Sequence, residues 1–237
     1  MFLSVIVPVY NEVLHIRETL SKISNYLKNK EWNSEIIVVN DGSNDNSLTE
    51  IEQANIENLH VISFAKNLGK GAAVKAGMLA AQGEWLLFID ADYSTAIEEL
   101  DQFWPRLQEG RDIIIGSRGL KESKVVIPQS KFKVCLGKAG NKLIQLLAVP
   151  SVKDSQCGFK LFNKKCLPLF QKQTLSRWGF DFEILFLARQ EKFKILELPV
   201  TWENRPASRV KLLDYPKTFL ELIKIRINYL RGIYEKE

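Results

Sequence analysis

Residues 85–95 of the chain read WLLFIDADYST. The first five residues are apolar and predict a buried strand, which ends in Asp90 and Asp92 with only Ala91 between them. Because side chains two residues apart on an extended segment point to the same side, we expect the two carboxylates to converge. Like charges held together raise the pKa of one group or require a cation, and carboxylate oxygens suit Mg²⁺ or Mn²⁺. We therefore predict a metal site here; the alternative is that Asp92 caps the next helix while Asp90 is solvated.

Short apolar runs alternate with helical patterns throughout the first half of the chain. Strands are predicted at residues 3–7, 35–39, 59–64, 85–89 and 112–115. Helices are predicted at residues 12–29, after Asp45, at 71–82 and at 96–109. Fully apolar strands between amphipathic helices are typical of a parallel sheet that is covered on both faces. The predicted fold class is therefore α/β, a Rossmann-like, doubly wound and mostly parallel sheet flanked by helices.

The alternation stops after Gly116, and the second half has a different pattern. We predict a loop, a cationic amphipathic helix, a second helix, a last strand and a closing amphipathic helix, at residues 119–130, 131–148, 180–191, 194–200 and 215–234. No repeat and no clear linker interrupts the chain. We therefore predict one globular domain with a nucleotide-binding part, residues 1–118, and an acceptor-binding part, residues 119–237.

Composition and charge narrow the class of protein. Of 237 residues, 46% are hydrophobic and 26% are charged, as in soluble globular proteins with a substantial core. The apolar runs are too short to cross a bilayer, and no secretory signal is visible. Cys135, Cys157 and Cys166 lack disulfide or zinc-site spacing, so reduced cytosolic thiols are expected. The net charge of +5, with six lysines against one acid between Lys121 and Lys142, suits nucleic acid, an anionic membrane, a phosphorylated substrate or a solvated surface.

All five predicted strands of the first half end in small, charged or amide residues. Ligands of open parallel sheets bind outside the carboxyl ends of the strands, so these ends are predicted to form one site. The segments are Pro8–Glu12, Asn40–Ser43, Lys66–Gly71, Asp90–Asp92 and Gly116–Arg118. Gly69–Val74 has no third glycine for a dinucleotide fingerprint, and no phosphate-loop Gly-Lys-Ser/Thr is present, which excludes a Rossmann dehydrogenase and a P-loop NTPase. A glycine-rich helix start beside Lys66 and Lys70 remains as a setting for an anion.

A set of ordered motifs makes the chain resemble a known family. SVIVPVYNE, VVNDGSNDNS, KNLGKGAAVKAG, LLFIDADYST and IGSR occur in the order and at the spacings of inverting GT-A-type glycosyltransferases of the family-two group. DSQCGFKLF (154–162) and RWGFDFEILFLAR (177–189) are similar to the dolichyl- or polyprenyl-phosphate sugar synthases, and most similar to the dolichyl-phosphate glucosyltransferase branch. The resemblance covers residues 2–210 and implies a GT-A fold.

The resemblance also implies roles for particular residues. Those that would bind the nucleotide-sugar donor are Pro8, Tyr10, Asn11, Glu12, Asp41, Gly42, Ser43, Lys66, Asn67, Gly69, Lys70, Asp90, Ala91 and Asp92, with Asp90 and Asp92 as the metal ligands. Those that would meet the acceptor phosphate are Arg118, Lys131, Lys133, Arg205, Ser208 and Arg209. The catalytic group would be Asp154, Arg118 and Gln156, with Asp154 either a base or a charge that steadies the sugar ring in the transition state. Asp181 and Glu183 are expected to support the structure or the site.

Two positions depart from the mannosyl-phosphate synthases of this group. The glutamine that those relatives place two residues after the second aspartate is Ser94 here, within the wording of the glucosyl branch. The arginine before their acceptor helix is replaced by Lys131 or Lys133, and a lysine cannot form a bidentate fork with phosphate. The first departure favours glucose over mannose.

The implied reaction is transfer of glucose from UDP-glucose to a polyprenyl phosphate with inversion, assisted by Mg²⁺ or Mn²⁺. A GDP-mannose-dependent enzyme, a family-two transferase with a saccharide acceptor and a non-catalytic binding module are the alternatives. Nucleic acid is not expected as a partner, because the paired aspartates would repel its backbone. This resemblance places the chain at the cytoplasmic face of a membrane, as a peripheral protein or through an anchoring partner subunit.

The closing helix allows two interpretations. Its apolar residues are Phe219, Leu222, Ile223, Ile227, Leu230 and Ile233. With the neighbouring lysines and arginines, this stripe could lie in an anionic membrane surface. It could equally pack on the core of the domain.

Overall fold

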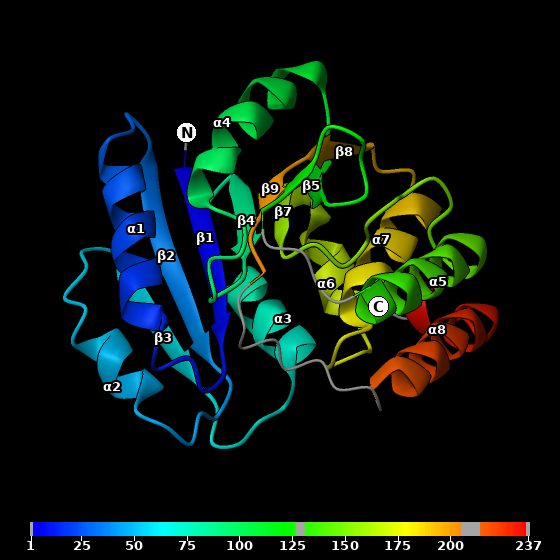
Figure 1. The fold of residues 1–237 in the computed structure, drawn as a ribbon, viewed down its shortest axis with the longest axis horizontal. Coiled ribbons are helices and arrows are strands. Elements are labelled where there is room, and N and C mark those ends of the chain that lie inside the picture. The colour runs from blue at the N-terminus through cyan, green and yellow to red at the C-terminus, as the bar shows by residue number, and fades with distance from the viewer. Residues whose placement is uncertain (1, 127–130, 205–213, 236–237) are drawn as a thin grey trace.

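The computed structural model describes residues 2–126, 131–204 and 214–235, which form a central sheet covered by helices (Figure 1). The strands of this sheet are β1 (Phe2–Val9), β2 (Asn33–Asn40), β3 (Leu59–Ser63), β4 (Trp85–Ile89), β5 (Ile113–Ser117), β7 (Phe159–Asn163) and β8 (Ile195–Pro199). Their order is β3-β2-β1-β4-β7-β5-β8. All neighbours are parallel except β7, which runs antiparallel to β4 and β5. The predicted α/β, mostly parallel sheet is confirmed.

The central position of β7 is the main feature that the sequence pattern does not predict. Its residues, Phe159–Asn163, form a short apolar run interrupted by Lys160, and periodicity does not separate such a run from a loop. The strand comes from the second half of the chain but lies between two strands of the first half. The two halves therefore share one sheet.

Helices cover both faces of the sheet (Figure 1). The α-helices are α1 (Ile16–Lys28), α2 (Ser47–Glu52), α3 (Lys70–Ala80), α4 (Leu100–Phe103), α5 (Lys131–Leu147), α6 (Leu167–Lys172), α7 (Phe180–Gln190) and α8 (Asp214–Leu230). Ile6 and Phe88 belong to the core beneath α3, α7 and α8, whereas their neighbours Val5 and Leu87 belong to the core beneath α1. This alternation from face to face is the period expected of a strand buried on both sides.

Two predicted elements differ from the structure. Residues 96–109 are not one helix but two 3₁₀ turns, Ile97–Glu99 and Trp104–Glu109, around the single turn of α4. Pro105, near the start of the second turn, has no N–H to continue an α-helical ladder. The predicted loop at 119–130 contains the short strand β6 (Lys124–Val125), which pairs with β9 (Thr201–Trp202).

The apolar residues of α8 divide between two surfaces. Leu222 and Ile225 are buried in the core, whereas Ile223 and Leu230 remain 37% and 82% exposed. The expectation that the apolar residues of this helix form one stripe on one surface, either in the core or at a membrane, is therefore wrong. Apolar side chains lie on more than one side of the helix axis. None of the helices within the described residues is both long enough and apolar enough to span a membrane.

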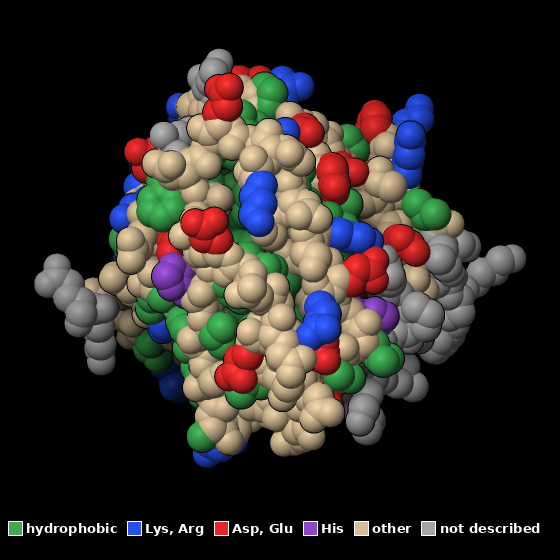
Figure 2. All heavy atoms as spheres, turned by 90° about the vertical axis from the view of Figure 1, so that its left-hand side faces the viewer, with side chains coloured by type: hydrophobic (Ala, Val, Ile, Leu, Met, Phe, Trp, Pro, Cys, Tyr) green, Lys and Arg blue, Asp and Glu red, His purple; other side chains and the backbone are tan. Residues whose placement is uncertain are grey.

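The opposite end of the molecule has an ordinary polar surface. Figure 2 looks onto the side formed by α1, α2 and β3, where acidic and basic side chains are interspersed and form no continuous area of one sign. Charges of both signs mixed in this way are typical of a solvated surface.

Candidate active site

The loops after β1 and β2 are tied together at the carboxyl edge of the sheet. The backbone N–H of Asn11 donates to Oγ of Ser43 (2.9 Å), and the N–H of Asn44 donates to Oδ1 of Asn11 (2.6 Å). The N–H of Glu12 donates to Oγ of Ser47 (2.6 Å). Asn11 has a positive φ of 54°, a conformation that asparagine tolerates better than most residues. The structure thus brings Asn11, Glu12 and Ser43 together, as the sequence predicts.

Asp41 organises the glycine-rich loop that follows β3. Its buried carboxylate accepts from the N–H groups of Leu68 (2.7 Å) and Gly69 (2.9 Å) and from Nδ2 of Asn67 (2.8 Å). Burial raises the pKa of Asp41 even though these N–H groups favour the charged form. Gly42 has a φ of +65°, and a Cβ there would lie 2.4 Å from the backbone carbon of Lys66. Asp41 and Gly42 therefore hold the loop against β2, a role that sequence reasoning does not anticipate.

The remaining predicted donor residues differ in accessibility. Pro8 and Ala91 are buried, Tyr10 is half-buried, and Lys66 is exposed. Gly69 has a φ of +109° and precedes the first turn of α3, where a Cβ would lie 2.4 Å from the carbonyl oxygen of Ser176. Only glycine fits this close approach of two backbones. The N–H of Ala72 in the same turn donates to the carbonyl oxygen of Ser176 (3.0 Å), so the start of α3 is covered by that loop.

Asp90 and Asp92 come close through a turn and not through an extended segment. The N–H of Tyr93 donates to the carbonyl oxygen of Asp90 (3.2 Å), and Tyr93 has a φ of 56°. Burial and then the charge of Asp90 raise the pKa of Asp92, whose carboxylate also accepts from the N–H of Ser94 (2.9 Å). The expected extended geometry is wrong, but the two carboxylates are close enough to repel.

Two neighbours hold Asp90 in place. Nζ of Lys70 lies 2.6 Å from its Oδ1. The N–H of Asp90 donates to the carbonyl oxygen of Gly158 (3.1 Å), and a Cβ on Gly158 would lie 1.9 Å from Oδ2 of Asp90. Sequence reasoning does not single out Gly158, although its place within the motif DSQCGFKLF is a signal that could have found it.

The aspartate pair suits a hard divalent cation. Among the described residues, no group of three or more His, Cys, Asp or Glu side chains could hold a metal. Mg²⁺ commonly needs only one or two carboxylates, because substrate phosphates and water complete its shell. Burial and then the charge of Asp90 raise the pKa of Asp92, and a cation between the two carboxylates would offset their repulsion. Asp90 and Asp92 thus fit Mg²⁺ or Mn²⁺ bound together with a diphosphate.

Asp154 and Arg118 form a bidentate ion pair. Nε and Nη2 of Arg118 lie 2.6 Å and 2.9 Å from the two carboxylate oxygens, and the N–H of Arg118 also donates to Oδ2 (2.9 Å). Burial opposes ionisation, but Arg118 outweighs it and lowers the pKa of Asp154. The guanidinium also lies 5.3 Å from the ring of Trp202, and Gln156 is half-buried nearby in the chain. A carboxylate held in this way is a weak proton acceptor and a good orienting group.

Asp181 and Glu183 are buried at the start of α7. Asp181 pairs with Lys160, a buried lysine whose only sequence signal is its position inside the apolar run of β7. Glu183 accepts from the N–H groups of Thr174 and Leu175 and from the hydroxyl of Tyr234 (3.0, 2.9 and 2.8 Å). Glu183 therefore supports the structure, as expected.

Several predicted acceptor residues lie outside the described part of the chain. Arg205, Ser208 and Arg209 are not described, and neither are the side chains of Lys131 and Lys133, which begin α5. The N–H of Glu203 donates to the carbonyl oxygen of Ser94 (2.8 Å). The described chain before residue 205 therefore runs beside the loop that carries Asp92.

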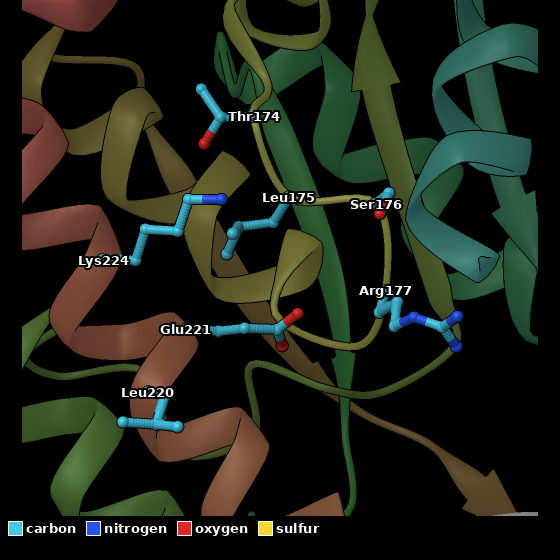
Figure 3. A pocket seen from close by; sticks show the side chains of 7 residues that line it. All are labelled: Thr174, Leu175, Ser176, Arg177, Leu220, Glu221 and Lys224. Carbon is cyan, nitrogen blue, oxygen red and sulfur yellow. The ribbon is translucent and has the colours of Figure 1, made fainter. Parts of the chain in front are cut away.

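A hollow of about 200 Å³ lies between the loop 174–177 and α8 (Figure 3). Arg177 points away from Glu221 and Lys224, and its charge acts on Asp41. None of the residues that line this hollow is a predicted donor, acceptor or metal residue. The candidate site is therefore the carboxyl edge of the sheet, where the predicted residues gather, and not this hollow.

Comparison with known proteins agrees with this geometry. Residues 4–168 match the family described as Glycosyl transferase family 2. The chain is 34% identical over 258 residues to the dolichyl-phosphate beta-glucosyltransferase of Saccharomyces cerevisiae, covering 99% of this chain and 77% of that protein. It is 36% identical over 248 residues to such an enzyme of Trichomonas vaginalis, covering 99% and 76%.

Solved structures share the fold at low identity. Glucosyl-3-phosphoglycerate synthase from Mycobacterium tuberculosis, in complex with Mn²⁺, UDP-glucose and phosphoglyceric acid, has a TM-score of 0.71 at 18% identity, covering 94% of this chain and 79% of that one. Mannosyl-3-phosphoglycerate synthase from Rubrobacter xylanophilus has a TM-score of 0.71 at 15% identity, covering 100% and 76%. These glycosyltransferases share the GT-A-like sheet seen here. The chain therefore belongs to glycosyl transferase family 2 and is a glycosyltransferase.

Proposed function

We propose that the protein transfers glucose from UDP-glucose to a polyprenyl phosphate, with inversion at the anomeric carbon and with Mg²⁺ or Mn²⁺ as cofactor. The observation that carries the proposal is the aspartate pair at the carboxyl edge of the sheet, with Lys70 beside it. The names of the relatives support the acceptor class and the sugar. Ser94, where the mannosyl-phosphate synthases have glutamine, agrees with them.

The donor would lie across the carboxyl edge of the sheet. The loop held by Asp41 would present Lys66, Asn67 and Gly69 to the nucleoside, and Lys70 would place a positive charge beside the diphosphate. Asp90 and Asp92 would hold the cation, which would neutralise charge on the leaving diphosphate. A solved structure of the same fold, in complex with Mn²⁺ and UDP-glucose, supports this choice of cation and donor.

Arg118 would orient the acceptor phosphate. Within the described residues, Asp154 accepts from two of the five side-chain N–H groups of Arg118, so the other three could donate to the acceptor phosphate. A phosphate monoester has a second pKa of about 6 and is largely dianionic at neutral pH, so the acceptor needs positioning more than deprotonation. We therefore assign Asp154 to holding Arg118 and steadying charge near the sugar, and not to proton abstraction. Gln156, Lys131, Lys133, Arg205, Ser208 and Arg209 remain predicted contacts of the sugar or phosphate.

The outer surface of α8 would meet the membrane that holds the acceptor. Phe219, Ile223, Ile227 and Leu230 form an exposed apolar row. At 100° per residue the exposed Arg226 lies on one side of this row, and Lys217, Lys224 and Arg231 lie on the other. An apolar row with cations on both sides suits the interface of an anionic bilayer. This arrangement favours peripheral attachment at the cytoplasmic face, with an anchoring partner subunit as the alternative.

One assay tests donor and acceptor together. Purified protein, Mn²⁺ and a short-chain polyprenyl phosphate are incubated with radiolabelled UDP-glucose, UDP-galactose, UDP-GlcNAc or GDP-mannose. We expect lipid-linked product from UDP-glucose, with loss of product when a chelator removes the metal. Product from GDP-mannose alone would replace the glucosyl assignment with the mannosyl one. Glucose transfer to a saccharide acceptor supplied in a parallel reaction, with none to the lipid, would overturn the acceptor class.

A further inference from the structure

The side chain of Glu197, on β8, holds the segment that carries Asp154. Residues 148–158 join α5 to β7 without a helix or strand of their own. Within that segment, the backbone N–H groups of Lys153 and Asp154 donate to the two carboxylate oxygens of Glu197 (3.0 and 2.8 Å). Hydrogen bonds to an ionised acceptor are stronger than those between neutral groups. Glu197 therefore fixes the backbone of Asp154 where no regular secondary structure does so.

The contacts of Glu197, Asp154 and Arg118 form a closed ring on one pair of strands. Glu197 on β8 lies opposite Ile115 on β5, and Arg118 directly follows Ser117, the last residue of β5. Asp154 accepts from the backbone N–H of Arg118 (2.9 Å) and, through both oxygens, from its guanidinium (2.6 and 2.9 Å). Asp154 is thus held through its backbone by β8 and through its side chain by the end of β5.

The ring leaves one charged group accessible to a ligand. The side chain of Asp154 is 10% exposed, whereas that of Arg118 is 32% exposed. On another side, the guanidinium carbon of Arg118 lies 5.3 Å from the centre of the Trp202 ring. A guanidinium between two fixed neighbours keeps a defined orientation, and that orientation follows the position of Asp154.

Anchoring of the segment does not by itself account for Glu197. Nη1 of Arg189 donates to the carbonyl oxygen of Pro150 (2.8 Å), and Nδ2 of Asn141 donates to that of Lys153. These two hydrogen bonds hold the segment through carbonyl groups and do not involve Asp154. The carboxylate of Glu197 is the group that binds the N–H of Asp154, so it acts on the orientation of that residue.

We propose that Glu197 is a positioning residue that fixes Asp154 and, through it, directs the guanidinium of Arg118 toward the acceptor phosphate. The inference rests on the acceptor role that the proposed function gives to Arg118. Without the Glu197 carboxylate, the backbone of Asp154 could rotate. Its carboxylate would then no longer hold Arg118 in one place.

Binding of a short-chain polyprenyl phosphate in the presence of UDP and Mn²⁺, measured by titration calorimetry, tests the inference without turnover. We expect Glu197→Ala to weaken this binding about tenfold, because outer partners that orient a binding group commonly contribute that much. The affinity for UDP with Mn²⁺ should change by less than about twofold, because that site does not depend on Glu197. Glu197→Gln keeps one acceptor oxygen and should weaken acceptor binding less, in the same direction.

The matched control lies on the same segment. Arg189→Gln weakens the anchor at Pro150 and should leave acceptor binding as in the wild type. Thermal unfolding of each variant shows whether it folds, and Glu197→Gln serves as the test if Glu197→Ala does not. In an Arg118→Lys background, the bidentate contact with Asp154 is gone. Glu197→Ala should then change acceptor binding by less than about twofold.

The outcomes separate the inference from the proposed function. If the wild type binds the polyprenyl phosphate and every folded variant at Glu197 binds it equally well, the inference is overturned. The same holds if UDP binding falls as much as acceptor binding, or if Glu197→Ala has its full effect in the Arg118→Lys background. If the wild type binds no polyprenyl phosphate, the acceptor role of Arg118 is wrong and the inference falls with it.

Discussion

The carboxyl edge of the sheet in the first half and the outer surface of α8 in the second half differ in chemical character. In residues 2–118, backbone N–H groups and polar side chains tie one loop to the next, as Asn11 does with Ser43 and Asp41 with Gly69. In the second half, α8 leaves Phe219 and Leu230 exposed. A polar, hydrogen-bonded edge suits a charged ligand that must be oriented, whereas an exposed apolar row suits a surface without fixed geometry. The contrast matches a nucleotide-sugar on one side and a lipid on the other.

We expect the largest loss of activity from a substitution at the polar edge of the sheet. Asp92→Ala removes one of the two carboxylates that would hold the cation, so we expect activity to fall at least about a hundredfold. Affinity for Mn²⁺ in the presence of UDP should fall with it. The control is Asp101→Asn. Asp101 lies away from the candidate site and forms an ion pair with Lys30 (2.6 Å). Undiminished activity and Mn²⁺ affinity in Asp92→Ala would contradict the metal role.

A substitution in the second half should disturb the first half almost as strongly. In Gly158→Ala the new Cβ would lie 1.9 Å from Oδ2 of Asp90 and must displace it. Displacing a reacting or ligating group by about 1 Å costs about a hundredfold in rate, so we expect a loss of this order. Gly137→Ala on α5, where a Cβ meets nothing within 4 Å, should retain full activity. An active Gly158→Ala would mean that Asp90 tolerates movement.

Two leucines on α8 allow its buried and exposed surfaces to be compared by substitution. Leu222 is 1% exposed, so Leu222→Ala should lower the free energy of unfolding by about 2–5 kcal/mol, measured in urea.

Leu230 is 82% exposed, so Leu230→Glu should change the free energy of unfolding by no more than about 0.5 kcal/mol. It should instead weaken sedimentation with anionic vesicles, because it puts a negative charge in the apolar row. Unchanged vesicle binding in Leu230→Glu would remove α8 from the membrane assignment.

We expect the smallest effect, a change in the free energy of unfolding, from a contact between the two halves of the chain. Asp112, beside β5, pairs with Lys165 and accepts from the N–H of Lys194 (2.8 Å). Burial opposes ionisation, but these partners outweigh it and lower the pKa of Asp112. A lowered pKa stabilises the fold above the unfolded-state value and loses that effect as the pH falls through the folded-state value.

We therefore expect Asp112→Asn to lower the free energy of unfolding at neutral pH by less than about 1 kcal/mol, since the lysine is exposed. The difference from the wild type, measured by urea unfolding, should shrink in acid. A difference that grows as the pH falls would contradict this sign.

Much of the fold could be predicted from the sequence because the first half is locally consistent. Its strands are mostly apolar runs, apart from the polar His60 and Ser63 in β3, and each predicted run overlaps an observed strand. The polar residues at their ends come together because parallel strands carry their carboxyl ends to one edge. The prediction of one helix at residues 96–109 is wrong. Their apolar spacing is helical, but Pro105 has no N–H and interrupts the hydrogen-bond ladder.

The amino-acid sequence is enough to predict the strands of the first half, the edge where the candidate site lies and the pair Asp90 and Asp92, because these depend on neighbours in the chain. The partners of the charged side chains, in contrast, are visible only in the folded chain. The antiparallel insertion of β7 places Gly158 against Asp90 and buries Lys160 beside Asp181, and the fold joins Asp154 to Arg118. It also turns Leu222 inward and Leu230 outward. Such contacts join residues far apart in the chain, and their energies depend on burial, which no local pattern records.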